Sequence, residues 1–240
     1  MKKIILSFVT LIVSTCAYAL GPDIFNHLGA GLGVGTNGIS VELGTKITPF
    51  VTMRAGVHFM PSIKFHTDAN AYYTLADASS HSTEINIEGD LGRTQGSVIF
   101  NAYPVPKIPF FIAAGAFFGG KDLIKVKGHS NEFVGHEGGS LEIGDYNIPI
   151  DSEGNARGGL EVKSFRPYLG IGYGNFIPSK LLNFNVELGI QFQQKPKVYT
   201  ANGELTQLVT EEDPDNTIHD IQKYLKVYPC LTFRLSGKIF

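Results

Sequence analysis

The sequence predicts an all-β protein, an eight-stranded antiparallel transmembrane β-barrel built as an up-and-down meander. Apolar and polar residues alternate in eight segments of about ten residues, which is the length that a tilted strand needs to cross a bilayer. The connections between these segments are alternately short and long, which is typical of outer-membrane barrels. We therefore expect short periplasmic turns at one end and three long outer loops at the other.

The clearest alternation lies in the hairpin 165–194. Leu169 and Ile171 are separated by glycine in its first half, and Val186 and Leu188 flank a glutamate in its second half. A period of two indicates strands, because successive side chains leave opposite faces of a pleated ribbon. The same pattern predicts strands over 27–35, 39–47, 51–59, 93–103, 110–120 and 226–240.

The connections divide by length into two sets. The predicted periplasmic turns are 48–49, 104–109 and 175–183, and the outer connections are the tight Asn37-Gly38 turn followed by 60–92, 121–163 and 197–223. By count the three long connections are acidic, with five acids to one lysine, eight acids to five bases and six acids to two lysines. We expect 60–92 to extend its strands as a hairpin arm, and 215–225 is compatible with a short helix.

The N-terminus has the pattern of a secretory signal peptide over 1–19. A basic start and a short apolar core precede the small residues Ala17 and Ala19, so we predict cleavage after Ala19. Cys16 offers an alternative, a lipoprotein signal, but Thr15 is a poor residue before a lipidated cysteine. The remaining chain, 20–240, is predicted to be a single outer-membrane β-barrel domain with both termini in the periplasm.

Composition restricts the other possibilities. After cleavage Cys230 is the single cysteine, so an internal disulfide is excluded. A net charge of −2 gives no basic field of the kind that would suggest nucleic acid as a partner. The 28 glycines and the absence of tryptophan argue against a helical bundle. No segment beyond the N-terminus is long and apolar enough for a membrane helix.

The polar faces of the strands carry charged residues that would point into the barrel. An eight-stranded barrel has an interior just wide enough for side chains, so we expect a packed ion-pair network and no water-filled pore. Inward glycines would make room for the long side chains, and Arg166 and Glu187 are expected to be partners. The predicted network consists of Glu42, Lys46, Arg54, Arg166, Glu187 and Arg234.

Aromatic residues gather near the strand ends, where they suit interfacial girdles. They are Phe50, Phe59, Tyr103, Phe110, Phe118, Phe165, Tyr173, Phe176, Phe184, Phe192 and Tyr228. A soluble lipocalin-like barrel is the alternative, with the apolar face inside. The absence of tryptophan and the uninterrupted apolar faces argue against it.

Three segments resemble small outer-membrane β-barrel proteins of Bacteroidota-type bacteria. They are RPYLGIGYG at 166–174, FNVELGIQF at 184–192 with KPKVY at 195–199, and VYPCLTFRLSGKIF at 227–240. The resemblance implies a fold and a location, because this family has no settled activity. Terminal Phe240 is similar to the signal read by the barrel-assembly machinery. The usual signal has apolar residues at alternate positions before the terminal one, and here those positions hold Lys238, Ser236 and Arg234. We therefore expect a bulge near Gly237 or a shifted register in the last strand.

Several motifs could carry chemistry. Gly33-x-Gly35-x-x-Gly38 matches a nucleotide-binding pattern, but a strand follows where a helix would be needed. His129, Glu132, His136 and Glu137 leave a loose metal site open, although a solvated loop is the simpler interpretation. The acidic run 211–215 leaves Ca²⁺, or a divalent bridge to lipopolysaccharide, open in the same way. A lipid-modifying enzyme of the deacylase type would need a His-x-Ser pair on one strand face. In His81-Ser82 and His129-Ser130 the histidine and the serine are consecutive residues, so their side chains diverge.

We therefore expect a non-enzymatic outer-membrane barrel without a cofactor or a structural metal, exported to the cell outer membrane. Its role would be structural or in surface interaction through acidic outer loops, with outer-membrane lipid or lipopolysaccharide around it. A porin-like narrow channel for small solutes and, third, a lipid-modifying enzyme are the alternative functions. The sequence does not indicate the extracellular partner.

Overall fold

A computed structural model describes residues 27–74, 80–105, 107–131, 134, 140–143, 146–178, 181–194, 196–200, 206–207 and 226–239. The signal peptide, the acidic run 211–215, the helix expected over 215–225 and Phe240 lie outside these residues. None of the described segments is a helix long and apolar enough to cross a membrane.

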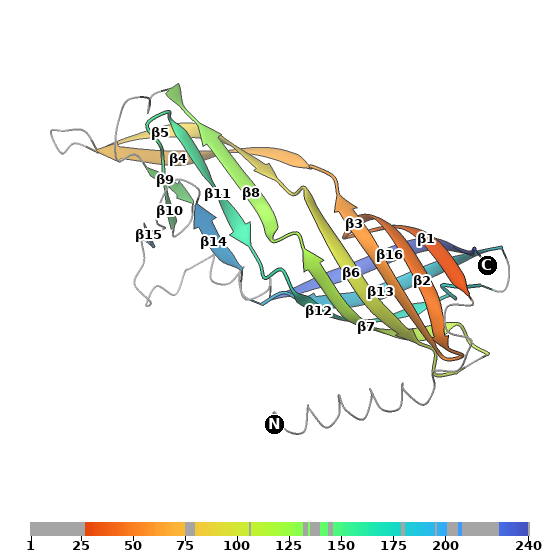
Figure 1. The fold of residues 1–240 in the computed structure, drawn as a ribbon. Helices are drawn as coiled ribbons and strands as arrows, with labels where there is room; N and C mark the ends of the chain where they lie inside the picture. The colour runs from red at the N-terminus through yellow and green to blue at the C-terminus, as the bar shows by residue number, and fades with distance from the viewer. Residues whose placement is uncertain are drawn as a thin grey trace, which may run out of the picture.

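Eight antiparallel strands close into a barrel in the order β1-β16-β13-β12-β7-β6-β3-β2 (Figure 1). Each barrel strand pairs with the barrel strands that precede and follow it in the chain, and the last pairs with the first. The predicted up-and-down meander is therefore confirmed. Each predicted barrel strand is found, with ends that differ by a few residues. The strands are β1 (Leu28–Gly35), β2 (Gly38–Thr48), β3 (Val51–Met60), β6 (Arg93–Ala102), β7 (Phe110–Gly119), β12 (Arg166–Tyr173), β13 (Leu182–Phe192) and β16 (Val227–Lys238).

The barrel closes where β1 pairs with β16. This pairing runs from Gly29 opposite Lys238 to Gly35 opposite Thr232 without a shift. Of the two expected alternatives, the bulge near Gly237 is wrong, because β16 keeps one register against both of its neighbours; the shifted register, which is counted from Phe240, falls on a residue outside the described ones. The described irregularity in the barrel pairing lies instead between β2 and β3, near Lys46.

The outer surface of the barrel is apolar. Leu169 and Leu188, in the middle of β12 and β13, are 53% and 55% exposed, while charged residues on the opposite faces are buried. This orientation is the reverse of a lipocalin-like barrel, which would bury the apolar face. Most of the large apolar side chains on the outward faces of the barrel strands are exposed, as a lipid-facing surface requires.

Aromatic side chains frame the apolar band in two rows. One row contains Phe50, Phe110, Tyr173 and Phe184, and the other contains Phe59, Phe118, Phe165 and Phe192, all exposed. On most of these strands the two rows are eight residues apart, which is roughly 26 Å along a strand. A strand tilt of about 40° reduces this length to roughly 20 Å across the barrel, somewhat less than the apolar belt of about 25 Å that is typical of membrane barrels.

Three aromatic residues expected in the girdles lie inside the barrel. Phe176 is 1% exposed, and Tyr103 and Tyr228 pack against a buried cluster that includes Phe111 and Tyr168. Alternation assigns a side chain to a face only within a strand, and Phe176 lies in a turn. The girdle assignment is therefore wrong for these three residues.

A second eight-stranded sheet extends beyond one end of the barrel, and the C-terminus lies at the other end (Figure 1). We call this sheet the arm. The hairpin expected in 60–92 is present as β4 (Lys64–Thr74) and β5 (Ser80–Asp90), which pair along their full lengths. The remaining strands, which the sequence pattern does not predict, are β8 (Asp122–His129), β9 (Ser140–Ile143), β10 (Tyr146–Pro149), β11 (Asn155–Glu161), β14 (Lys197–Thr200) and β15 (Thr206–Gln207).

The arm has one apolar and one polar face. Ile85 and Ile87 of β5 pack with Ile148, Ile150 and Ala156 in a buried cluster. This cluster lies on the side that continues the barrel interior, because odd-numbered positions are buried in β5 and again in β6. The polar face is consequently the outward side of the arm.

Candidate functional site

The middle of the barrel lumen holds a closed ring of two arginines and two glutamates, which we call the charge cycle. Arg54 contacts Glu42 at 2.5 Å and Glu187 at 2.5 Å. Arg234 contacts the same two glutamates at 2.9 and 3.0 Å. Each arginine therefore bridges both carboxylates, and the cycle has no net charge.

The charge cycle draws on strands from both ends of the chain. Glu42 and Arg54 come from β2 and β3, while Glu187 and Arg234 come from β13 and β16. All four side chains are only 1–2% exposed. A buried charge is tolerated when it is paired and its remaining hydrogen-bonding atoms are satisfied, and this arrangement meets that condition.

Neighbouring polar groups complete the hydrogen bonding of the cycle. Tyr168 donates its hydroxyl proton to Glu187 over 2.7 Å, and Ser40 donates to Glu42 over 3.3 Å. The Nε of Arg54 donates to the amide oxygen of Asn101 at 3.2 Å. These contacts fix the rotamers of the charged side chains, so the network is held from several strands at once.

Glycines make room for the cycle. A Cβ on Gly56 would lie 2.5 Å from Cγ of Glu42, and one on Gly31 would lie 3.0 Å from Cδ of Arg234. These positions face the lumen beside the longest side chains. The structure therefore gives the inward glycines the place that the sequence analysis expected.

Arg166 lies in a different layer, nearer the arm. It donates to the side-chain oxygens of Gln95 at 2.8 Å and Gln191 at 3.1 Å. It also donates to the main-chain carbonyls of Gly119 at 2.7 Å and Lys163 at 2.9 Å. The expected pairing of Arg166 with Glu187 is wrong, because alternation gives the face of a residue but not its height in the barrel.

The outer layer is tied together by amides. Asn37 accepts hydrogen bonds from Gln95 at 3.0 Å and from Gln191 at 2.9 Å. Arg93 stacks on the ring of Tyr228 with its guanidinium carbon 4.8 Å from the centroid. This layer closes the end of the barrel from which the arm extends.

The opposite end of the lumen is filled by the turn after β12. The backbone N–H of Phe176 donates to the hydroxyl of Tyr103 at 3.2 Å, and the guanidinium of Arg234 lies 5.9 Å from the centre of the Phe176 ring. Ile177 is buried beside it. The lumen is thus occupied by side chains at three levels: the turn, the charge cycle and the amide layer.

Lys46 of the predicted ion-pair network and the loose metal site at His129 remain to be placed in the structure. Lys46 is half-buried near the end of β2, and within the described part of the chain it makes no ion pair. His129 is hydrogen-bonded to Asn155 and Asn131, while Glu132, His136 and Glu137 lie outside the described residues. Among the residues with described positions, no three His, Cys, Asp or Glu are grouped to hold a metal.

A histidine–serine pair that the sequence analysis missed lies in the lumen. His58 Nε2 and Ser97 Oγ are 2.8 Å apart, on the neighbouring strands β3 and β6. Both side chains are buried, at 3% and 5% exposure. The two residues are 39 positions apart in the chain, so no local motif could have indicated the pair.

No protein-family model matches the chain, and no curated protein matches it either. Among solved structures, the crystal structure of Acinetobacter baumannii CarO2 is similar, with 20% identity, 88% of this chain and 98% of that chain covered, and a TM-score of 0.48. That of Acinetobacter baumannii CarO has 15% identity, 87% and 96% coverage, and a TM-score of 0.48. The assignment of the barrel rests on the strand pairing of this chain itself. The resemblance to Bacteroidota barrels stays a prediction.

Proposed function

We propose that the protein is an integral outer-membrane barrel with a sealed lumen, which anchors the arm at the cell surface for structural support or surface interaction. The short-turn end and both termini would face the periplasm. In this view the barrel supplies position and stability, and the long outer connections supply the contacts. Export by the predicted signal peptide and assembly through Phe240 belong to the same proposal.

The apolar band between two aromatic rows supports the membrane location. In lipid every backbone polar group must be paired within the protein, and closure of β1 on β16 leaves no free strand edge in the barrel. A direct test uses membranes prepared from producing cells. The protein should resist extraction by mild aqueous buffer and migrate faster on gels when it is not heated. Release by buffer alone would refute the location.

The charge cycle carries the proposal of a sealed lumen. A continuous column of water through this level would expose the guanidinium and carboxylate groups, but they are 1–2% exposed. The purified barrel should therefore show no unitary conductance in planar bilayers. Reproducible steps that scale with salt concentration would favour the channel alternative.

A non-enzymatic role is also part of the proposal. His58 and Ser97 resemble a catalytic pair in distance, but their burial keeps substrates away from the hydroxyl. Lipid A from a deletion strain and its parent should have the same mass spectrum. A difference that is restored by the intact gene would support the lipid-modifying alternative.

A further inference from the structure

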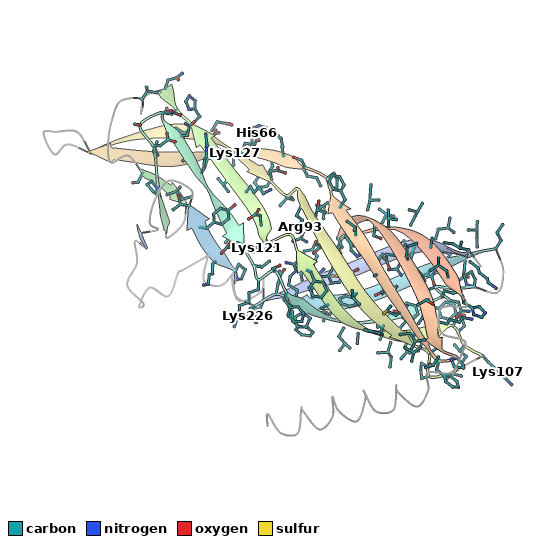
Figure 2. All side chains as sticks on the ribbon, in the orientation of Figure 1. His66, Arg93, Lys107, Lys121, Lys127 and Lys226 are labelled. Atoms are coloured by element: carbon teal, nitrogen blue, oxygen red, sulfur yellow. The ribbon has the colours of Figure 1, made fainter. Side chains whose placement is uncertain are left out.

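The outward face of the arm carries a row of charged residues that crosses four strands. Strand pairing places His66 opposite Glu88, Glu88 opposite Lys127, and Lys127 opposite Arg157. All four side chains lie on the face opposite the buried isoleucine cluster, because residues directly opposite each other share a face of a sheet. Figure 2 shows His66 and Lys127 together on the arm, away from the barrel.

The row contains more positive charge than it can pair. Glu88 contacts Lys64 at 3.0 Å and His66 at 3.7 Å. Within the described part of the chain, Lys127 and Arg157 have no ion pair. Like charges directly opposite each other on adjacent strands are destabilising. The placement of Lys127 directly opposite Arg157 is therefore not explained by the packing of the sheet.

The same residues line a hollow of about 440 Å³ on this face. Gly128, Asn86, His129 and Asn155 complete the lining, the last three with amide and imidazole groups. Among the described residues, the lining contains no Val, Leu, Ile, Met, Phe, Tyr or Trp side chain. A ligand for this hollow should thus be anionic and hydroxyl-rich, and an apolar compound would find no complementary surface.

The position of the row indicates where such a ligand would come from. From Ile85 to Asn101 the odd-numbered residues of β5 and β6 are buried, apart from half-buried Leu91. The even-numbered side, which carries Glu88, therefore continues the lipid-facing side of the barrel, which carries Val98. The row lies roughly 20 Å along the chain beyond the aromatic residue Phe59. With a strand tilt of about 40°, this length places the row roughly 15–20 Å above the aromatic residues, which is beyond a phospholipid head-group layer and at the level where the saccharide of a glycolipid would lie.

We propose that Lys127 and Arg157 bind phosphate groups on the saccharide of a lipopolysaccharide molecule beside the barrel, with the neighbouring amides on its hydroxyls. The inference rests on the proposed function, since this face meets the outer leaflet only if the barrel spans the outer membrane. The net acidity of the long connections does not oppose it. Screening limits the reach of exposed charges to about 10 Å, so the local arrangement decides.

The test measures binding of phosphorylated rough lipopolysaccharide to the refolded full chain in neutral micelles. The variant Lys127→Gln/Arg157→Gln should weaken binding roughly tenfold or more, because two charge-assisted contacts are lost. Lys107→Gln is the matched control, because Lys107 lies at the opposite end of the molecule (Figure 2) and should leave binding unchanged. Glu88→Gln should strengthen binding by removing the one carboxylate in the row.

Three results would overturn the proposal: wild-type affinity in the double variant, equal binding of dephosphorylated lipopolysaccharide, or binding of a soluble acidic polysaccharide in place of the glycolipid. Unchanged heat-modifiable migration shows that each variant is folded. Conductance is measured on the same samples. A barrel that conducts ions but loses lipopolysaccharide binding in the double variant would refute the sealed lumen and retain this site.

Discussion

Arg54 and Glu187, 133 residues apart in the chain, are joined across the barrel interior by two hydrogen bonds of 2.5 and 2.6 Å. Arg54 also holds Glu42 on the neighbouring strand. These contacts therefore join β2 and β3 to β13 on the opposite side of the barrel. Disturbing them should affect the whole barrel and not one strand alone.

Replacing Arg54 by Met should destabilise the barrel by about 3–5 kcal/mol, because two buried carboxylates then share one arginine. The free energy of unfolding can be measured by denaturant titration in micelles with circular dichroism. The matched control is Arg54→Met/Glu187→Met, which removes one charge of each sign. Its loss should be smaller than the sum of the single losses. Strict additivity would show that the two residues do not act together.

Gly44→Val should also destabilise the barrel, by about 1–3 kcal/mol, through overpacking. A Cβ at Gly44 would lie 2.5 Å from Cε1 of Phe176, so the ring could not keep its place in the lumen. Adding Phe176→Ala should recover part of the loss in the same unfolding measurement. If the double variant is less stable than Gly44→Val alone by the full cost of Phe176→Ala, the two sites are independent.

Single tryptophans can separate the aromatic rows from the lumen, because the chain has none of its own. Phe118→Trp should place the indole at the lipid interface, where brominated lipids quench its fluorescence. Phe176→Trp should be protected from the same lipids, since Phe176 is buried in the lumen. Equal quenching of both variants would contradict the inward position of the turn.

Tyr199 of the arm should titrate at unusually high pH. Burial and then the carboxylate of Asp122 raise the pKa of Tyr199 from 10.0 to about 12. Because the folded protein favours the neutral phenol, the contribution of Tyr199 to the free energy of unfolding is fully present below pH 10. It is lost as the pH rises towards 12 and the phenol ionises. Tyrosinate absorbance of the wild type minus that of Tyr199→Phe isolates this group, and Asp122→Asn should lower its midpoint. An unmoved midpoint in Asp122→Asn would exclude the carboxylate as a cause.

Alternation predicts all eight barrel strands because one face of each contacts a uniform surrounding and the other a polar interior. The same rule fails in the arm. Strand β11 reads NARGGLE and shows no regular period of two, and in β8, which reads DLIKVKGH, the alternation is limited to the six residues from Ile124 to His129. The arm is covered on its apolar face by short strands such as β10, so its pattern depends on which strand covers it. That information is not local in the sequence.

The lumen was predictable in composition but not in arrangement. Four of the six proposed residues meet in the charge cycle, because charges that point into a narrow barrel have few other partners. Arg166 binds carbonyls and amides one layer away, since the number of residues along a strand does not reveal which strands face each other across the lumen. Phe176 was misplaced because a turn has no period to read.

The charge cycle also has a consequence for assembly. Glu42 and Arg54 are made early in the chain and Glu187 and Arg234 late, while β1 and β16 must meet before the two halves face each other. A barrel that is still open would hold these four residues without the opposite half of the cycle. Seam closure and satisfaction of the buried charges are thus a single event. The charge cycle therefore lowers the free energy of the closed barrel, in which β1 and β16 are fully paired, relative to that of any partly closed intermediate.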